Sequence, residues 1–157
     1  MNIIETDSQG KHQQEWLNKN HQNKYGYPVT LLGDDLYSRQ PVCTLLLKQG
    51  YNFIFVCLET SHKTLYEWLE FLERNGEVIT VEKKQWDGRK NLIYRYRYAS
   101  RVPLKDGDSS LEANWCEVTV INEKTQKIIY RNSWITRTFA KINYGIILGY
   151  FNFRFGN

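Results

Sequence analysis

The chain has 157 residues, of which 41% are hydrophobic and 24% charged, and its formal net charge is +4. This composition is typical of a globular protein and argues against a disordered chain. No apolar run approaches the roughly twenty residues of a membrane span, and the first residues lack the basic and then apolar pattern of a secretory signal. We therefore expect a cytoplasmic protein with no membrane partner.

Positive charge is concentrated in the second half of the chain. Residues 1–75 contain 7 Lys and Arg against 9 Asp and Glu, whereas residues 76–157 contain 14 against 8. Between Gly88 and Lys105 there are six cations and no acid, and six more cations without an acid follow from Lys124 onward. Such stretches attract polyanions such as nucleic acid, but a solvated basic sheet face has the same composition.

The first half of the chain has a mixed helix and strand pattern. A weakly amphipathic surface helix is expected over residues 8–24. The run PVTLLGDD, which begins at Pro28, predicts a buried strand that ends at Gly33. A helix that starts near Pro41 and stops at Gly50 leads to a second apolar strand in NFIFVCLE, so residues 28–58 are expected to form a βαβ unit.

A second helix and four strands are expected after this unit. Ser61 is a candidate cap for a helix that ends at Gly76, and its apolar stripe contains Leu65, Trp68, Leu69 and Leu72. The apolar period then changes from 3.6 to 2 residues, and Asp87-Gly88 is typical of a hairpin turn. Antiparallel strands are predicted over residues 78–86, 91–99, 115–121 and 127–135.

The strand predicted over residues 91–99 has aromatic side chains on one face and basic side chains on the other. Tyr94, Tyr96 and Tyr98 share one face, which we interpret as a core face rather than a row for base stacking. Arg95 and Arg97 share the other face and are candidate contacts with a phosphate backbone. The full set of candidate DNA-binding residues is Arg89, Lys90, Arg95, Arg97 and Arg101.

Asp34 is the candidate catalytic residue, because it directly follows a strand expected to be buried and central. Open α/β sheets bind ligands at that end of a strand, and a hard cation such as Mg²⁺ prefers carboxylate oxygens. Asp35 is expected to support the loop. The alternative is that both acids only end the strand and start a turn.

The remaining candidates have less specific patterns. The three histidines, His12, His21 and His62, occupy apparent surface or helix-start positions and show no metal-ligand spacing with the cysteines, so we interpret them as surface histidines. Ser38 and Ser61 lack the sequence context of a nucleophile elbow. The cysteines, Cys43, Cys57 and Cys116, are widely spaced and are expected to be reduced core thiols.

The run LLGDDLYSRQPVCTLLLKQGYNFIFVCLETSHKTLYEWLE resembles the segment around the second catalytic aspartate of bacterial insertion-sequence transposases of the DDE type. The later stretches NLIYRYRY, VPLKDG and NWCEVTV resemble the same family, so that the similarity extends from about Tyr27 to about Ile135. The resemblance implies a ribonuclease H-like domain that binds two divalent metals, Mg²⁺ or Mn²⁺, through two Asp and one Glu. It implies that Asp34 matches the second Asp.

The resemblance also implies DNA as the partner, specifically transposon ends, and a homodimer for full-length members of the family. The basic strands would correspond to a β-rich insertion that takes part in DNA binding. On this basis residues 1–76 are expected to form a partial ribonuclease H-like core, residues 77–136 the β-rich insertion, and residues 137–157 a divergent tail. The expected fold class is α/β or α+β.

The chain departs from the family pattern at two of the three catalytic positions. The only Asp upstream of Asp34 is Asp7, which lies in a polar stretch, and no Asp or Glu follows Glu123. Two-metal phosphoryl transfer needs carboxylates that converge from several elements. We therefore expect a truncated or frameshifted transposase fragment that is inactive alone. The alternatives are a non-catalytic nucleic-acid-binding module and an α/β enzyme of another kind with a closed pocket over Asp34.

Overall fold

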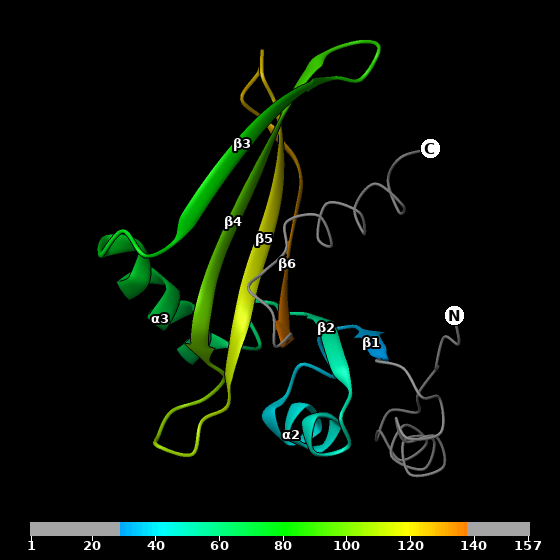
Figure 1. Cartoon of the computed structure of the whole chain (residues 1–157). Helices are drawn as coiled ribbons and strands as arrows, with labels where there is room; N and C mark the ends of the chain where they lie inside the picture. The colour runs from blue at the N-terminus through cyan, green and yellow to red at the C-terminus, as the bar shows by residue number, and fades with distance from the viewer. Residues whose placement is uncertain (1–28, 138–157) are drawn as a thin grey trace.

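The structure, a computed structural model, describes residues 29–137 (Figure 1). A βαβα segment is followed by four strands, as expected from the sequence. The helix expected over residues 8–24 and residues 138–157 of the expected tail lie outside the described residues. The elements are β1 (Thr30–Gly33), α2 (Gln40–Lys48), β2 (Asn52–Val56), α3 (Lys63–Arg74), β3 (Ile79–Trp86), β4 (Asn91–Pro103), β5 (Glu112–Asn122) and β6 (Ile128–Arg137).

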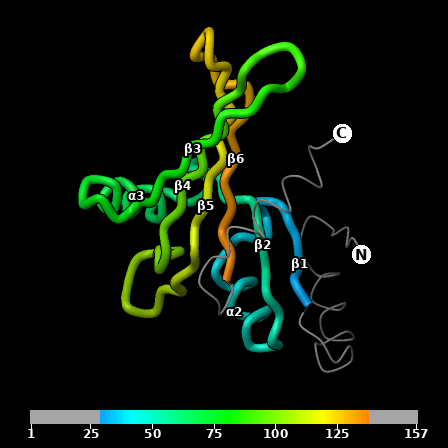
Figure 2. The backbone as a smooth tube through the Cα atoms, turned by 45° about the horizontal axis from the view of Figure 1, so that its top comes forward, coloured from blue at the N-terminus to red at the C-terminus, as the bar shows by residue number. Residues whose placement is uncertain are grey.

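All six strands belong to one sheet with the order β1-β2-β6-β5-β4-β3 (Figure 2). The β1–β2 pair is parallel, which confirms the predicted βαβ unit, and the other pairs are antiparallel. Because β2 pairs with β6, with Phe55 opposite Ile135, the expected partial core and β-rich insertion share a single sheet. The described part is therefore a mixed α/β fold with a mostly antiparallel sheet.

The position of β1 corrects one expectation. Within residues 29–137 this strand is at the edge of the sheet, and its residues are exposed or half-buried rather than buried. Leu31 packs against the core, whereas Leu32, on the opposite face, is 38% exposed. The apolar run had suggested a strand buried on both faces, but only one face of it is covered by the main core.

The main core lies between the sheet and both described helices. Gly33 is needed in this region, because a Cβ atom there would lie only 2.7 Å from the Tyr37 ring and 2.9 Å from the Phe55 ring. The buried side chains of this cluster come from both helices, from four strands and from the adjoining loops: Cys43, Leu46, Tyr51, Phe53, Phe55, Cys57, Leu65, Leu69, Leu72, Ala99, Val102, Leu104, Ala113, Trp115 and Ile135.

A second apolar cluster occupies the opposite face of the sheet. Its buried members are Leu92, Cys116, Val118, Val120 and Trp134, and its half-buried members are Ile54, Val56, Tyr94, Tyr96, Tyr98 and Tyr130. The tyrosine row is thus confirmed as part of an apolar face. Side chains alternate between faces along a strand, so this cluster lies on the side away from α2 and α3.

Helix α3 begins and ends close to its predicted limits. The residue at its N-terminal boundary is His62 rather than Ser61, and no side chain caps the helix. Gly76 has a positive φ of 73°, and the Glu77 N–H donates to the Leu72 carbonyl at 2.8 Å, which closes the helix with a Schellman motif. Trp68 was expected in the buried stripe but is 43% exposed, where it stacks on Phe71.

Strands β3 to β6 form a long arm that reaches past the ends of β1 and β2 (Figure 1). The predicted hairpin at Asp87-Gly88 is confirmed as a four-residue turn, because Trp86 is opposite Asn91. The Asp87 Oδ1 atom accepts hydrogen bonds from the backbone N–H groups of Arg89 and Lys90, at 2.9 and 2.8 Å. We call these four strands with their turns the β-arm.

Candidate nucleic-acid interface

Asp34 lies immediately after β1, and its carboxylate accepts a backbone hydrogen bond within the turn that follows this strand. The side chain is exposed, and its Oδ1 atom accepts a hydrogen bond from the Leu36 N–H at 2.9 Å. This geometry agrees with the alternative in which the acid ends the strand and starts a turn. Asp34 thus sits on the surface.

The carboxylates of the described residues do not fit a two-metal centre. No group of three or more His, Cys, Asp or Glu side chains in residues 29–137 is arranged to hold a metal ion. Asp7, the only upstream Asp, lies outside the described residues. Two metal ions that stabilise the attacking and leaving oxygens of phosphoryl transfer need several converging ligands from the protein. We therefore assign no Mg²⁺ or Mn²⁺ site to residues 29–137.

Asp35 supports the loop, as expected, and does so within a buried polar cluster. Its Oδ1 atom accepts a hydrogen bond from the Leu58 N–H at 2.8 Å and lies 3.7 Å from His62 Nε2. Ser38 Oγ is 2.6 Å from His62 Nε2 and also donates to the Asp35 carbonyl at 2.6 Å. This cluster ties the loop after β1 to the loop before α3.

The prediction that His62 lies on the surface is wrong, since it is 5% exposed. Its position just before an amphipathic helix gave no periodic signal for burial. Although Ser, His and Asp meet here, they do not form a catalytic triad, because Ser38 and Asp35 both approach the same ring nitrogen. Ser38 is also fully buried, which excludes a substrate from its hydroxyl. The cluster is structural.

Acidification is expected to weaken the fold through His62. Burial lowers the pKa of His62, with Arg39 acting in the same direction and Asp35 opposing both. The unfolded chain then binds the extra proton more readily, so the free energy of unfolding should fall as the pH drops below the unfolded value of about 6.5. Urea denaturation at a series of pH values should show this loss in the natural chain. The His62→Gln variant should not show the loss of unfolding free energy that His62 causes at low pH. If the pH dependence of its stability equals that of the natural chain, His62 is not the cause of the loss.

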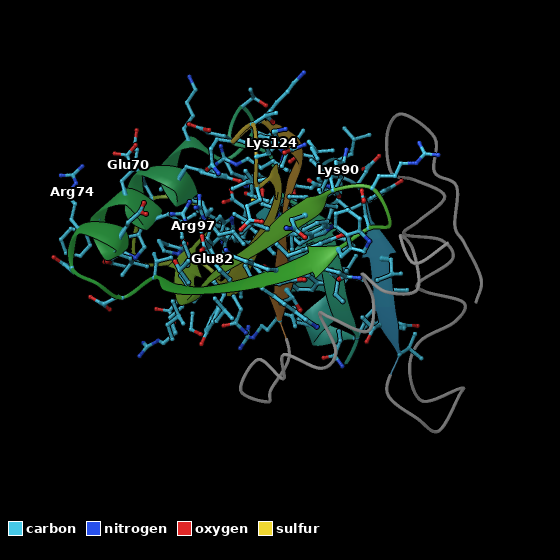
Figure 3. The ribbon with its side chains drawn as sticks, turned by 90° about the horizontal axis from the view of Figure 1, so that it is seen from above. Glu70, Arg74, Glu82, Lys90, Arg97 and Lys124 are labelled. Carbon is cyan, nitrogen blue, oxygen red and sulfur yellow. The ribbon has the colours of Figure 1, made fainter. Side chains whose placement is uncertain are left out.

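Arg97 is held inside the structure by two carboxylates. It contacts Glu73 of α3 at 2.8 Å and Glu117 of β5 at 3.2 Å, and its guanidinium lies 5.6 Å from the Trp115 ring centroid. Glu117 also binds Arg131 of β6 at 2.8 Å. Figure 3 shows Arg97 on the side of the sheet where α3 lies. Its charge is used to join α3 to three strands.

Arg95 and Arg101 also have carboxylate partners, although both are more exposed. Arg95 pairs with Glu82 across the β3–β4 ladder at 2.6 Å, and Arg101 pairs with Glu112 at 2.9 Å. Arg101 occupies a β-bulge with a positive φ of 59°. Three of the five predicted DNA contacts are therefore neutralised locally by Glu residues.

Arg89 and Lys90 lie together in the β3–β4 turn, beside a second basic turn that the sequence analysis did not select. The β5–β6 turn carries Lys124 and Lys127, and the Glu123 N–H donates to the Asn91 carbonyl at 3.1 Å, so the two turns are neighbours at their bases, at the same end of the sheet (Figure 1). Among the described residues no carboxylate lies within ion-pair distance of these four cations. We call Arg89, Lys90, Lys124 and Lys127 the basic tip.

The basic tip is well exposed at the far end of the β-arm. All four of its cations are exposed, and Trp86, which directly precedes the β3–β4 turn, is 61% exposed. Two acids also lie at this end, but Asp87 binds the turn backbone and Glu123 pairs with Lys84. The pairing of β4 with β5 brings the two turns together, which explains why charge counts along the chain did not reveal the tip.

The three cysteines are free and buried, as expected. Burial raises the pKa of the Cys43 and Cys116 thiols to about 12, and it also raises the pKa of Cys57. A protonated, buried thiol is a poor nucleophile and a poor metal ligand. The described part of the chain thus offers no cysteine chemistry.

Comparison with known proteins adds no family assignment. No family model matches the chain. A search of curated proteins likewise found no similar sequence. Within residues 29–137 no helix is both long and apolar enough to cross a membrane.

Proposed function

We propose that the chain binds DNA without cutting it and that the basic tip makes the main contacts with phosphates. The observation that carries this proposal is the presence of four exposed cations on two neighbouring turns, while Arg95, Arg97 and Arg101 are paired with carboxylates. Duplex DNA has one negative charge per about 1.7 Å of its axis, so exposed cations that contact its phosphates gain affinity by releasing counterions.

A relationship to DDE transposases is the specific form of this proposal. Two observations support it: a βαβ unit with Asp34 directly after its first strand, and the four basic antiparallel strands that follow. The chain would then be a transposase-like fragment that retains a DNA-binding β-arm. The exposed, turn-capping carboxylate of Asp34 is the reason to propose binding without catalysis.

Neutralising the basic tip is expected to remove most of the salt-dependent DNA affinity. Each cation that neutralises a phosphate contributes about −0.9 to the slope of log K against log salt, so four contribute about −3.6. Between about 50 and 200 mM salt this slope corresponds to roughly a 100-fold loss of affinity. In the variant that carries all four substitutions, Arg89→Ala, Lys90→Ala, Lys124→Ala and Lys127→Ala, the slope of log K against log salt should become shallower by about 3 to 4. Fluorescence anisotropy with a labelled duplex measures it.

The matched control removes four other cations, Lys48, Lys63, Arg95 and Arg101, and so changes the net charge equally. Its slope should stay close to that of the natural chain. Equal losses in both variants would mean that only total charge matters, which would overturn the assignment to the tip. The bound duplex should remain intact with Mg²⁺ or Mn²⁺; cleavage that disappears in Asp34→Ala would contradict the non-catalytic proposal.

A further inference from the structure

The second apolar cluster forms a sheet face that neither described helix covers. Its central positions lie on β5 and β6, where Cys116 is opposite Trp134, and the tyrosines of β4 flank them. The described helices contribute only to the core on the other side of the sheet. We call the face made by the second cluster the open face.

The open face has the character of an interior surface. Val118 is 2% exposed and Cys116 6%, values as low as those of residues beneath the helices. Because neither described helix lies on this face, such low exposure indicates contact with another segment. A covering segment for the open face must be apolar and must be able to reach β5.

Residues 138–157 meet both requirements. Eleven of these 20 residues are hydrophobic, six of them aromatic, and only Lys141 and Arg154 are charged. The segment follows directly from Arg137, the last residue of β6, and Trp134 of that same strand belongs to the open face. By contrast, residues 1–28 contain seven hydrophobic residues and six charged ones, and they lead into β1, which β2 and β6 separate from β5.

The length of the segment is also sufficient. Twenty residues reach about 66 Å when extended, at about 3.3 Å per residue. From Cys116 to Val120 the buried stripe on β5 spans about 14 Å, at about 3.4 Å per residue in an antiparallel strand. The segment is therefore long enough to cross the open face and cover more than one strand.

We propose that residues 138–157 dock on the open face through their aromatic and aliphatic side chains. The segment then completes the second layer of the fold, although its sequence was expected to be only a divergent tail. This inference does not depend on DNA binding, because the basic tip lies on the turns at the end of the β-arm.

The cysteines provide a built-in test, since Cys116 is on the open face whereas Cys43 and Cys57 lie in the main core. The experiment measures alkylation of each thiol by mass spectrometry in the full chain and in a chain that ends at Arg137. A buried thiol reacts only through local opening, so the shortened chain should label Cys116 about tenfold faster or more, with Cys43 and Cys57 little changed.

A second variant guards against general unfolding of the shortened chain. This full-length variant removes apolar side chains from the segment by the triple substitution Ile146→Ser, Ile147→Ser and Leu148→Ser. Its control carries the double substitution Asn143→Ser and Asn152→Ser. Selective acceleration at Cys116 in the first variant, absent from the control, supports the proposal. Unchanged labelling of Cys116 overturns it, as does equal acceleration at all three thiols. Protection of Cys116 that disappears on dilution would assign the open face to a second copy and would also overturn it.

Discussion

Trp115→Ala is expected to lower the free energy of unfolding by about 3 to 5 kcal/mol, the range found for removing a large aromatic side chain from a core. Trp115 of β5 is 1% exposed and is among the largest fully buried side chains of the described residues. Its ring meets Tyr66 of α3 edge-on, with ring centroids 6.2 Å apart, and lies beneath the Arg97 guanidinium. The cavity would therefore loosen the sheet from α3.

Urea denaturation followed by circular dichroism measures this loss. Trp86→Ala is the matched control, because Trp86 is 61% exposed and its removal should cost less than about 1 kcal/mol. Similar losses in the two variants would show that the cost does not come from core packing between the sheet and α3.

Glu117→Ala is expected to have the second largest effect, about 2 to 4 kcal/mol, because it breaks a buried ion pair by removing only one partner. Glu117 is 3% exposed and binds both Arg97 and Arg131, and Arg97 in turn binds Glu73 of α3. Without Glu117, Arg97 would remain partly buried with one carboxylate fewer. The loss should stay below the full cost of an isolated buried charge, because Arg131 is half exposed.

Equilibrium denaturation tests this prediction with a close control on the same sheet. Glu82→Ala removes the exposed partner of Arg95, and an exposed pair contributes at most about 1 kcal/mol. Glu117→Gln should lie between the two, since its amide oxygen still accepts one hydrogen bond. A loss in Glu117→Ala no larger than in Glu82→Ala would refute the role of Glu117 as the centre of this network.

Local patterns predicted the elements well, because each one carries its own periodicity or stop signal. Gly50 and Gly76 both adopt positive φ at helix ends, as expected, and the hairpin at Asp87-Gly88 is present. Alternation along β4 also placed Tyr94 and Arg95 on opposite faces. These features depend on short-range sterics and on the side-chain period of a strand, which a sequence displays directly.

Tertiary contacts were less predictable, because they depend on pairings between distant strands. The apolar run of β1 suggested a central strand, but its position at the edge of the described sheet follows from the pairing of β2 with β6. The sequence predicted Arg97 as a DNA contact, but in the structure its guanidinium pairs with Glu73 of α3 and Glu117 of β5. The basic tip likewise depends on the register between β4 and β5.

The pairing of β2 with β6 has a consequence for how the chain reaches this fold. Phe55 and Ile135 are partners although they are 80 positions apart, whereas the ladders from β3 to β6 join strands that are consecutive in the chain. Local hairpins form before distant pairings, because closing a long loop costs entropy that only the final contacts repay. During synthesis one edge of β2 therefore stays unpaired until β6, the last strand of the β-arm, has been made.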